Sequence, residues 1–123
     1  MEIKKLNQNG YKVINKYDSE GFLVSNVRIN DSILILYDYV KEFNFDGLNV
    51  PVDIVTPLIN ADPKIDLLII GHSKGLEFIL PNDINLLLKD NYIKIEKMIT
   101  SSACRTFNLL VGENRKVACL LLI

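Results

Sequence analysis

The chain has 123 residues, of which 49% are hydrophobic and 24% are charged, and its formal net charge is −1. A chain of this length is expected to form one domain, residues 1–123, and to bury a core without a disulfide or metal staple. A net charge so close to zero argues against a general nucleic-acid-binding protein, which would carry a basic excess.

The first third of the chain has the composition of β-strands. Residues 21–29 are predicted to form a strand, because Gly21–Val24 is followed by Val27 and Ile29 at a spacing of two. Asn30-Asp31-Ser32 is a turn sequence, and the apolar run 33–37 is predicted to return beside the first strand as a hairpin. Residues 40–45 alternate in hydrophobicity and can form one more strand.

The next segment, residues 54–71, contains one predicted helix followed by one predicted strand. Apolar residues recur at helical spacing between Ile54 and Ile59, with Pro57 among them. Either Thr56 caps a very short helix here, or Pro57 lies in the first turn of a longer one. Residues 65–70 are continuously apolar and end at Gly71, which is typical of a strand covered on both faces.

The last third alternates clearly between helix and strand. Pro81-Asn82-Asp83 opens a helix that Asn91 is expected to end in a left-handed conformation. The side chains of residues 92–98 alternate in hydrophobicity, so these residues are predicted to form a strand with one more solvent-exposed face. A third helix is expected to be capped by Ser101 or Ser102 and to end near Asn114. Residues 117–123 are apolar almost throughout and are expected to form a central strand.

This order of elements predicts an α/β fold with a β-rich N-terminal layer. Strands that alternate with helices pair in parallel, because a parallel pair needs a crossover connection.

The cysteines and apolar runs indicate a soluble protein of a reducing compartment. Cys104 and Cys119 are too few for a disulfide scaffold, so we expect reduced thiols and a cytoplasmic location. Residues 1–10 lack the apolar core of a signal peptide. The longest apolar runs have the length of strands, so we expect no membrane insertion.

Gly71-His72-Ser73-Lys74-Gly75 fits the G-x-S-x-G nucleophile elbow of serine hydrolases. Two features oppose a hydrolase. The residues that follow look extended or irregular up to Pro81, whereas the elbow requires a helix. The chain has one histidine, His72, and adjacent side chains on such a turn diverge, so Ser73 lacks a base. We interpret the segment as a glycine turn and expect no catalytic residues.

Cys104 has two interpretations. In the first turn of a helix, beside Arg105, its thiol would be acidified and reactive. Alternatively, Cys104 packs with Phe107 and Val111 against the sheet, which the helical spacing favours. One histidine and two distant cysteines do not have the spacing of metal ligands, so neither a zinc site nor a cofactor is expected.

The predicted topology brings two polar segments together. If strands 65–70 and 92–98 are parallel, residues 71–75 and 100–105 flank one crevice at the carboxyl edge of the sheet. Hydroxyls, cations and a helix N-terminus suit an anion. Alternatively, Arg105 is a structural cation and the loop is merely solvated. The candidate binding residues on these segments are Gly71, His72, Ser73, Lys74, Ser101, Ser102, Cys104 and Arg105.

The run Ala-Cys-Arg-Thr-Phe-Asn-Leu-Leu at 103–110 resembles the C-terminal motif of a small α/β family. That family includes the mitochondrial NADH:ubiquinone oxidoreductase (complex I) assembly factor 3 and many bacterial proteins. Gly21-Phe22 and the run 66–71 also fall in the order of the family. The resemblance departs at His72-Ser73, where the family has a small or hydroxyl residue followed by glycine, so Ser73 is not part of a family pattern.

The resemblance implies a three-layer β plus α/β fold around a central mixed sheet, without an established enzyme activity. It places importance, without a chemical role, on Gly71, Cys104, Arg105, Thr106 and Asn108. The leading hypothesis is therefore a non-catalytic protein-interaction module, an accessory or assembly factor whose protein partner belongs to a respiratory membrane complex. The alternative is a protein that binds a small anion or metabolite, or an unrecognised enzyme, using the crevice near Arg105 and Gly71–Gly75.

Overall fold

The computed structural model describes residues 11–123, which form eight strands, one 3₁₀-helix and three α-helices. The N-terminal elements are β1 (Ile14–Asp18), β2 (Gly21–Val24), β3 (Val27–Ile29), β4 (Ser32–Ile35) and β5 (Val40–Phe43). They are followed by η1 (Val52–Ile54), α2 (Val55–Ile59), β6 (Leu67–His72), α3 (Asn82–Asp90), β7 (Lys94–Ile99), α4 (Thr100–Gly112) and β8 (Val117–Leu121). The expectation for residues 1–10 lies outside the described residues.

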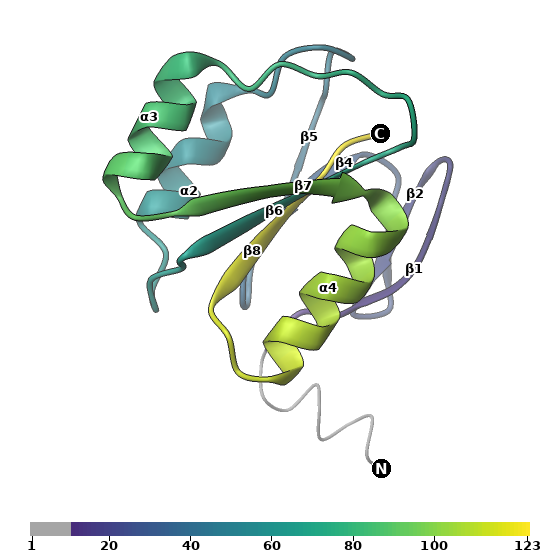
Figure 1. Cartoon of the computed structure of the whole chain (residues 1–123). Helices are drawn as coiled ribbons and strands as arrows, with labels where there is room; N and C mark the ends of the chain where they lie inside the picture. The colour runs from purple at the N-terminus through teal and green to yellow at the C-terminus, as the bar shows by residue number, and fades with distance from the viewer. Residues whose placement is uncertain (1–10) are drawn as a thin grey trace.

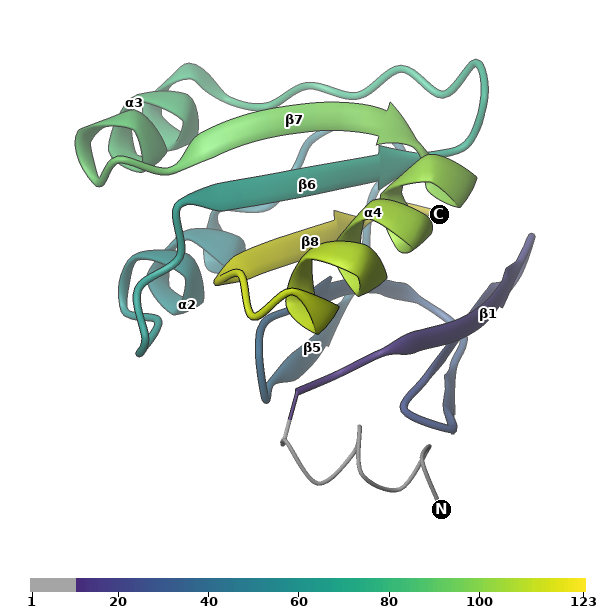
Figure 2. The ribbon, with the colours of Figure 1, turned by 60° about the horizontal axis from the view of Figure 1, so that its bottom comes forward.

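The centre of the fold is a five-stranded mixed sheet in the order β5-β4-β8-β6-β7. β6 is parallel to both β7 and β8, and Figure 2 shows the arrowheads of these three strands pointing the same way. β4 is antiparallel to β8 and to β5. The expectation that residues 117–123 form a central strand is confirmed, because β8 has two strands on each side.

Two cores lie on the two faces of this sheet. Side chains alternate along β8, so Val117, Cys119 and Leu121 enter one core while Ala118 and Leu120 enter the other. The first core is closed by α4 and by a separate sheet of β1, β2 and β3, and the second by η1, α2 and α3. Figure 1 shows α4 crossing in front of the parallel strands, with β1 and β2 beside it. The predicted three-layer α/β arrangement is thus confirmed.

The strand pairing of the N-terminal third differs from the prediction. Residues 21–29 form two strands, because Ser25 and Asn26 have φ angles of 46° and 68° and reverse the chain between β2 and β3. Two consecutive left-handed residues make the tight turn of a two-residue hairpin, and no glycine signalled it here. β4 therefore pairs with β5 and β8 and not with β3.

The helix ends also correct the sequence analysis. Neither predicted alternative for the helix around Pro57 holds in full: Pro57 lies in the first turn of α2, but α2 has only five residues, and its N-cap position is Ile54 and not Thr56. Asn91 does not adopt the left-handed conformation; its φ is −100°, and the next residue, Tyr92, has a φ of 60°. Asn114 does adopt it, with a φ of 64°. Among the described residues, no helix is both long and apolar enough to cross a membrane.

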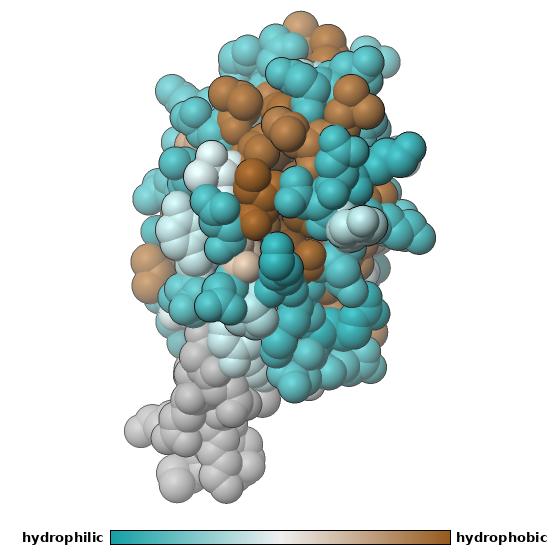
Figure 3. Space-filling view, turned by 90° about the vertical axis from the view of Figure 1, so that its left-hand side faces the viewer, coloured by the Kyte–Doolittle hydropathy of each residue, from teal (hydrophilic) through white to brown (hydrophobic). Residues whose placement is uncertain are grey.

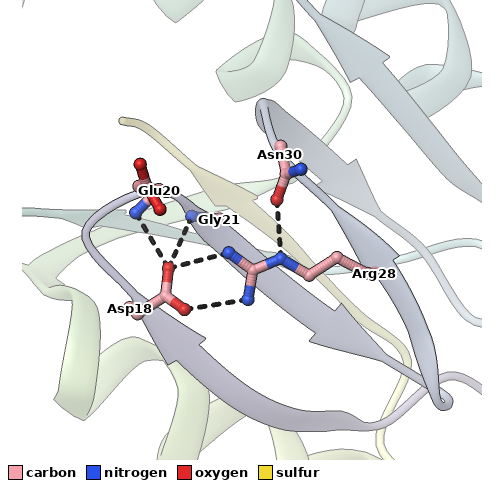
Figure 4. Close-up of polar contacts among 5 residues, drawn as sticks. All are labelled: Asp18, Glu20, Gly21, Arg28 and Asn30. Atoms are coloured by element: carbon pink, nitrogen blue, oxygen red, sulfur yellow. Dashed lines mark hydrogen bonds and ion pairs between the residues drawn. The ribbon is translucent and has the colours of Figure 1, made fainter.

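A polar network fastens the β1–β2–β3 sheet (Figure 4). The guanidinium of Arg28 donates to both carboxylate oxygens of Asp18 at 2.8 and 2.9 Å, and its Nε donates to Asn30 Oδ1 at 2.6 Å. The backbone N–H groups of Glu20 and Gly21 also donate to Asp18 Oδ1, at 2.9 and 3.0 Å. The Arg28 bond, together with these backbone bonds, lowers the pKa of Asp18 to about 2.

This network predicts a pH-dependent contribution to stability. Because the pKa of Asp18 is lower in the folded chain than its ordinary value of 3.8, its contribution is fully present above pH 4 and is lost as the pH falls towards 2. Urea unfolding at a series of pH values should therefore show that the difference between wild type and Asp18→Asn shrinks between pH 4 and pH 2. Asp90→Asn, on the exposed end of α3, is the control. A difference for Asp18→Asn that does not change with pH would contradict this assignment.

Candidate functional site

The parallel pairing of β6 and β7 brings the two predicted segments to the same edge of the sheet. The strands are in register from Leu67 opposite Lys94 to His72 opposite Ile99. The loop after β6 and the start of α4 after β7 therefore leave the sheet side by side, as the sequence predicted.

A crevice of about 520 Å³ lies at this edge, and we call it the carboxyl-edge crevice. It is lined by residues 17–19, Ser73, Lys74, residues 99–101 and Ile123. Ser73, Lys74 and Ser101 are thus brought together from the predicted set. Neither Ser101 nor Ser102 caps α4, because the helix begins at Thr100 and its N-cap position is Ile99, which offers no side-chain cap.

Arg105 lines a second, adjoining space of about 410 Å³ between β1 and α4, the Arg105 cavity. Its walls are residues 14–17 on β1 and Cys104, Arg105 and Asn108 on α4. Tyr17 lines both the cavity and the crevice. The separation arises because α4 begins at Thr100, which places Arg105 more than one turn along the helix. Ser102 and Thr106 are half-buried and line neither space.

His72 lies apart from both spaces. Its ring packs 5.4 Å from the ring of Phe78, and its Nδ1 is 3.1 Å from the carbonyl oxygen of Ser73. It lines a different hollow, with Leu48 and Lys97. The chain after Ser73 contains no helix before Asn82, where α3 begins. Histidine and serine are thus not arranged as base and nucleophile.

Cys104 is a core residue, only 4% exposed. It lies in the second turn of α4 rather than the first, beyond the N–H groups that would favour a thiolate. Burial raises the pKa of its thiol to about 12, and the nearby charge of Arg105 offsets only part of this effect. Of the two interpretations of Cys104, the geometry favours packing. Residues 11–123 contain no group of three or more potential metal ligands.

Asn108 joins α4 to β1 through both ends of its side-chain amide. Its Oδ1 accepts from the backbone N–H of Ile14 at 2.9 Å, and its Nδ2 donates to the carbonyl oxygen of Ile14 at 2.8 Å. The side chain therefore satisfies the backbone of Ile14 as a neighbouring strand would. Asparagine is suited to this position because one short amide supplies both a donor and an acceptor.

Gly71 is not a turn residue; it is buried inside β6. A Cβ atom at this position would lie 2.6 Å from Cβ of Ala103 and 2.6 Å from Cδ2 of Leu121. The absence of a side chain at Gly71 therefore allows α4 to pack closely on the sheet. Gly75 does adopt a glycine conformation, with a φ of 83°, and only there does the predicted glycine turn hold.

Comparison with known proteins identifies the family. The family described as protein of unknown function (DUF498/DUF598) matches residues 14–122. The chain belongs to this family. Gly71, Cys104 and Asn108, which the motif resemblance had marked without a role, all have packing or hydrogen-bonding roles in this DUF498/DUF598 chain.

Several relatives carry a functional name. The chain is 31% identical over 113 residues to NADH dehydrogenase (ubiquinone) 1 alpha subcomplex assembly factor 3 of Drosophila melanogaster, covering 89% of this chain and 58% of that protein. The protein of the same name from Xenopus tropicalis is 23% identical and is covered to 61%. The chain thus spans about 60% of the length of these relatives. A crystal structure from Bartonella henselae, described as an outer membrane protein, is 29% identical with a TM-score of 0.78, covering 92% of this chain and 95% of that chain.

The sequence analysis did not identify the β1 residues that form one wall of the Arg105 cavity. Lys16 lies on that wall, yet nothing in the sequence indicated that β1 would lie against α4. The pairing depends on the hydrogen bonds between Asn108 and Ile14, which are 94 positions apart. Contacts of such long range leave no periodic signal in either segment.

Replacing Asn108 with alanine should destabilise the fold. The change removes both bonds and leaves the part-buried N–H and C=O of Ile14 without them, at a cost of about 1–3 kcal/mol. Urea denaturation measures this loss. Arg105→Ala, an exposed position on the same helix, should change stability by less than about 0.5 kcal/mol. Equal effects of the two changes would contradict the role given to Asn108.

Replacing Gly71 with alanine should also destabilise the chain, by roughly 1–3 kcal/mol, because the new methyl group overlaps Ala103 and Leu121. Adding Ala103→Gly removes the overlap with Ala103 but places a glycine inside a helix, so the double variant should be more stable than the sum of the two single changes predicts. Gly112→Ala is the control, since a Cβ there meets nothing within 4 Å. Strict additivity of the two changes would contradict the proposed contact.

Proposed function

We propose that this protein is a non-catalytic interaction module that serves as an accessory or assembly factor for a respiratory membrane complex. The observation that carries the proposal is the likeness to proteins named assembly factor 3 of the NADH dehydrogenase 1 alpha subcomplex, which covers 89–91% of this chain. The positions of His72 and Cys104 described above offer no nucleophile with a base, which supports a binding role over a hydrolytic one.

The side of the molecule formed by η1, α2 and α3 supports an interaction role. Figure 3, which views this side, shows hydrophobic side chains running from the top of the view to its centre between hydrophilic ones. The elements here expose Val52, Leu86 and Leu87, which are 60%, 56% and 42% accessible. Gathered exposed apolar side chains mark protein-binding surfaces. We propose this side as the surface for the protein partner.

The experiment is affinity capture of the tagged full chain from detergent-solubilised membranes of cells that produce it. Subunits or assembly intermediates of a respiratory complex should co-purify with the wild type. The double variant Leu86→Lys/Leu87→Lys should reduce their recovery about tenfold or more, because a lysine in an apolar contact would be desolvated without a partner for its charge. Leu109→Lys, at a side chain that is 61% exposed on α4, is the matched control and should retain them.

Capture of the bait without any respiratory subunit would contradict the proposed function. Equal losses with the α3 and α4 variants would instead overturn the choice of surface. Circular dichroism melting of each variant shows that the comparison is made between folded proteins.

A second function, binding of a small anion or anionic metabolite, is favoured by the charges of the Arg105 cavity. Lys16 and Arg105 stand on opposite walls, and no carboxylate lines the cavity. Neither cation forms a salt bridge with any of residues 11–123. Lys74 adds a third cation in the adjoining carboxyl-edge crevice. Paired cations on opposing walls suit a phosphate or carboxylate.

Isothermal titration with inorganic phosphate, citrate and a nucleotide tests this second function. A ligand of the cavity should bind at least about fivefold more weakly to Lys16→Ala and to Arg105→Ala, since each change removes a charge-assisted hydrogen bond. Lys89→Ala, on α3, should leave the affinity unchanged. Binding that none of these variants alters, or no binding of any of the three anions, would remove the cavity as an anion site.

A further inference from the structure

Another cavity lies at the opposite edge of the sheet, where β6 and β8 begin, and we call it the amino-edge cavity. Its volume is about 530 Å³, within the range of small-molecule sites. Three parts of the chain enclose it: residues 36–41 around the β4–β5 turn, residues 53–65 from η1 to the start of β6, and Lys116–Val117. None of the residues selected from the sequence lines it.

The amino-edge cavity has an apolar base. Leu36, Ile65 and Val117 line it and are 6%, 7% and 1% exposed, so their side chains belong to the packed core. These residues are fixed by the sheet, because Leu36 directly follows β4 and Val117 begins β8. A ligand with an apolar or aromatic body would therefore meet apolar side chains that the sheet holds in place.

Two tyrosines supply aromatic walls. Tyr37 holds a cation within the chain itself, since Nζ of Lys116 lies 5.2 Å from the centre of its ring. Tyr39 lines the same cavity and is 42% exposed, which leaves much of its side chain open to a ligand. Rings of this kind attract ammonium groups through their negative faces.

The charges around the cavity favour a cation over an anion. Asp38 lines it from residues 36–41, and Asp53 and Asp62 line it from residues 53–65; none of them forms a salt bridge with any of residues 11–123. Two lysines oppose them, but Lys116 is held by the Tyr37 ring and by Oδ1 of Asn114 at 2.9 Å. Lys41 is the remaining lining lysine. Three carboxylates and two ammonium groups thus line the cavity, which leaves its lining with a net charge of about −1.

We propose that the amino-edge cavity binds a small organic cation, an amine or quaternary ammonium compound with an apolar or aromatic body. The apolar base receives the body of the ligand, while Tyr39 and the three carboxylates surround its positive group. The cavity shares η1 and α2 with the side proposed for the protein partner, but its lining includes neither Leu86 nor Leu87 and no residue of the Arg105 cavity.

The experiment uses benzyltrimethylammonium as the cationic probe and benzenesulfonate as an anion of related shape. Both are titrated into the ¹⁵N-labelled full chain and followed by amide chemical shifts. The ammonium compound should give saturable shifts confined mainly to residues 36–41, 53–65 and 116–117, and should bind at least about fivefold more tightly than the sulfonate.

The double variant Asp38→Asn/Asp62→Asn should weaken binding of the ammonium probe by roughly three- to tenfold, because it removes two of the three carboxylates. Asp90→Asn/Glu96→Gln changes the net charge equally at two exposed positions outside the cavity and should leave binding unchanged. Saturable shifts elsewhere on the molecule, equal binding of the two probes, or equal effects of the two double variants would each overturn the proposal. Failure here would leave the proposed interaction function untouched, because that function is tested by membrane capture.

Discussion

The attachment of α4 to its surroundings organises this fold. On one side, Gly71 and Ala103 let the helix lie directly on β6. On another, Asn108 exchanges two hydrogen bonds with the backbone of Ile14 and so holds the separate three-stranded sheet against the same helix. Without these contacts, the core that contains Phe22 and Phe107 would lose one of its walls. α4 therefore joins the three-stranded sheet to one face of the central sheet, whereas η1, α2 and α3 pack on the other face without it.

That arrangement explains why the sequence motif on α4, residues 103–110, was interpreted as functional. Cys104 of this motif is held by packing and Asn108 by hydrogen bonds to the backbone. Such contacts limit which amino acid can occupy a position as strictly as a catalytic role does. Arg105 differs, because it is exposed and lines a cavity with Lys16. Burial and hydrogen bonding thus explain Cys104 and Asn108, but neither explains why position 105 is an arginine.

Much of the central sheet could be predicted from the sequence, and the reason is burial. The apolar runs at 65–70 and 117–123 are long and continuous because both of their faces are covered, and this placed them correctly as parallel, central strands. The β1–β2–β3 sheet could not be predicted as well. Its tight turn uses Ser25 and Asn26 in left-handed conformations, which the spacing of two between Val27 and Ile29 conceals.

The candidate site was predictable only in part for a related reason. The topology correctly brought residues 71–75 and 100–105 to one edge, since parallel strands must end together. The direction of each side chain depended on details that carry no sequence signal. His72 turns to Phe78, α4 starts at Thr100, and β1 supplies Lys16 from far away in the chain. The amino-edge cavity was missed because turns and helix ends, rather than a motif, enclose it.

The position of β7 at the end of the central sheet restricts how this molecule can associate. An outermost strand presents unpaired backbone groups on which another chain can extend the sheet. β7 carries Lys94, Glu96 and Lys97, all exposed, along its six residues. Extending the sheet here would remove these charges from water, a cost that continuous edge-to-edge growth would repeat at every junction. The charges along β7 therefore disfavour continuous extension of the sheet at this edge.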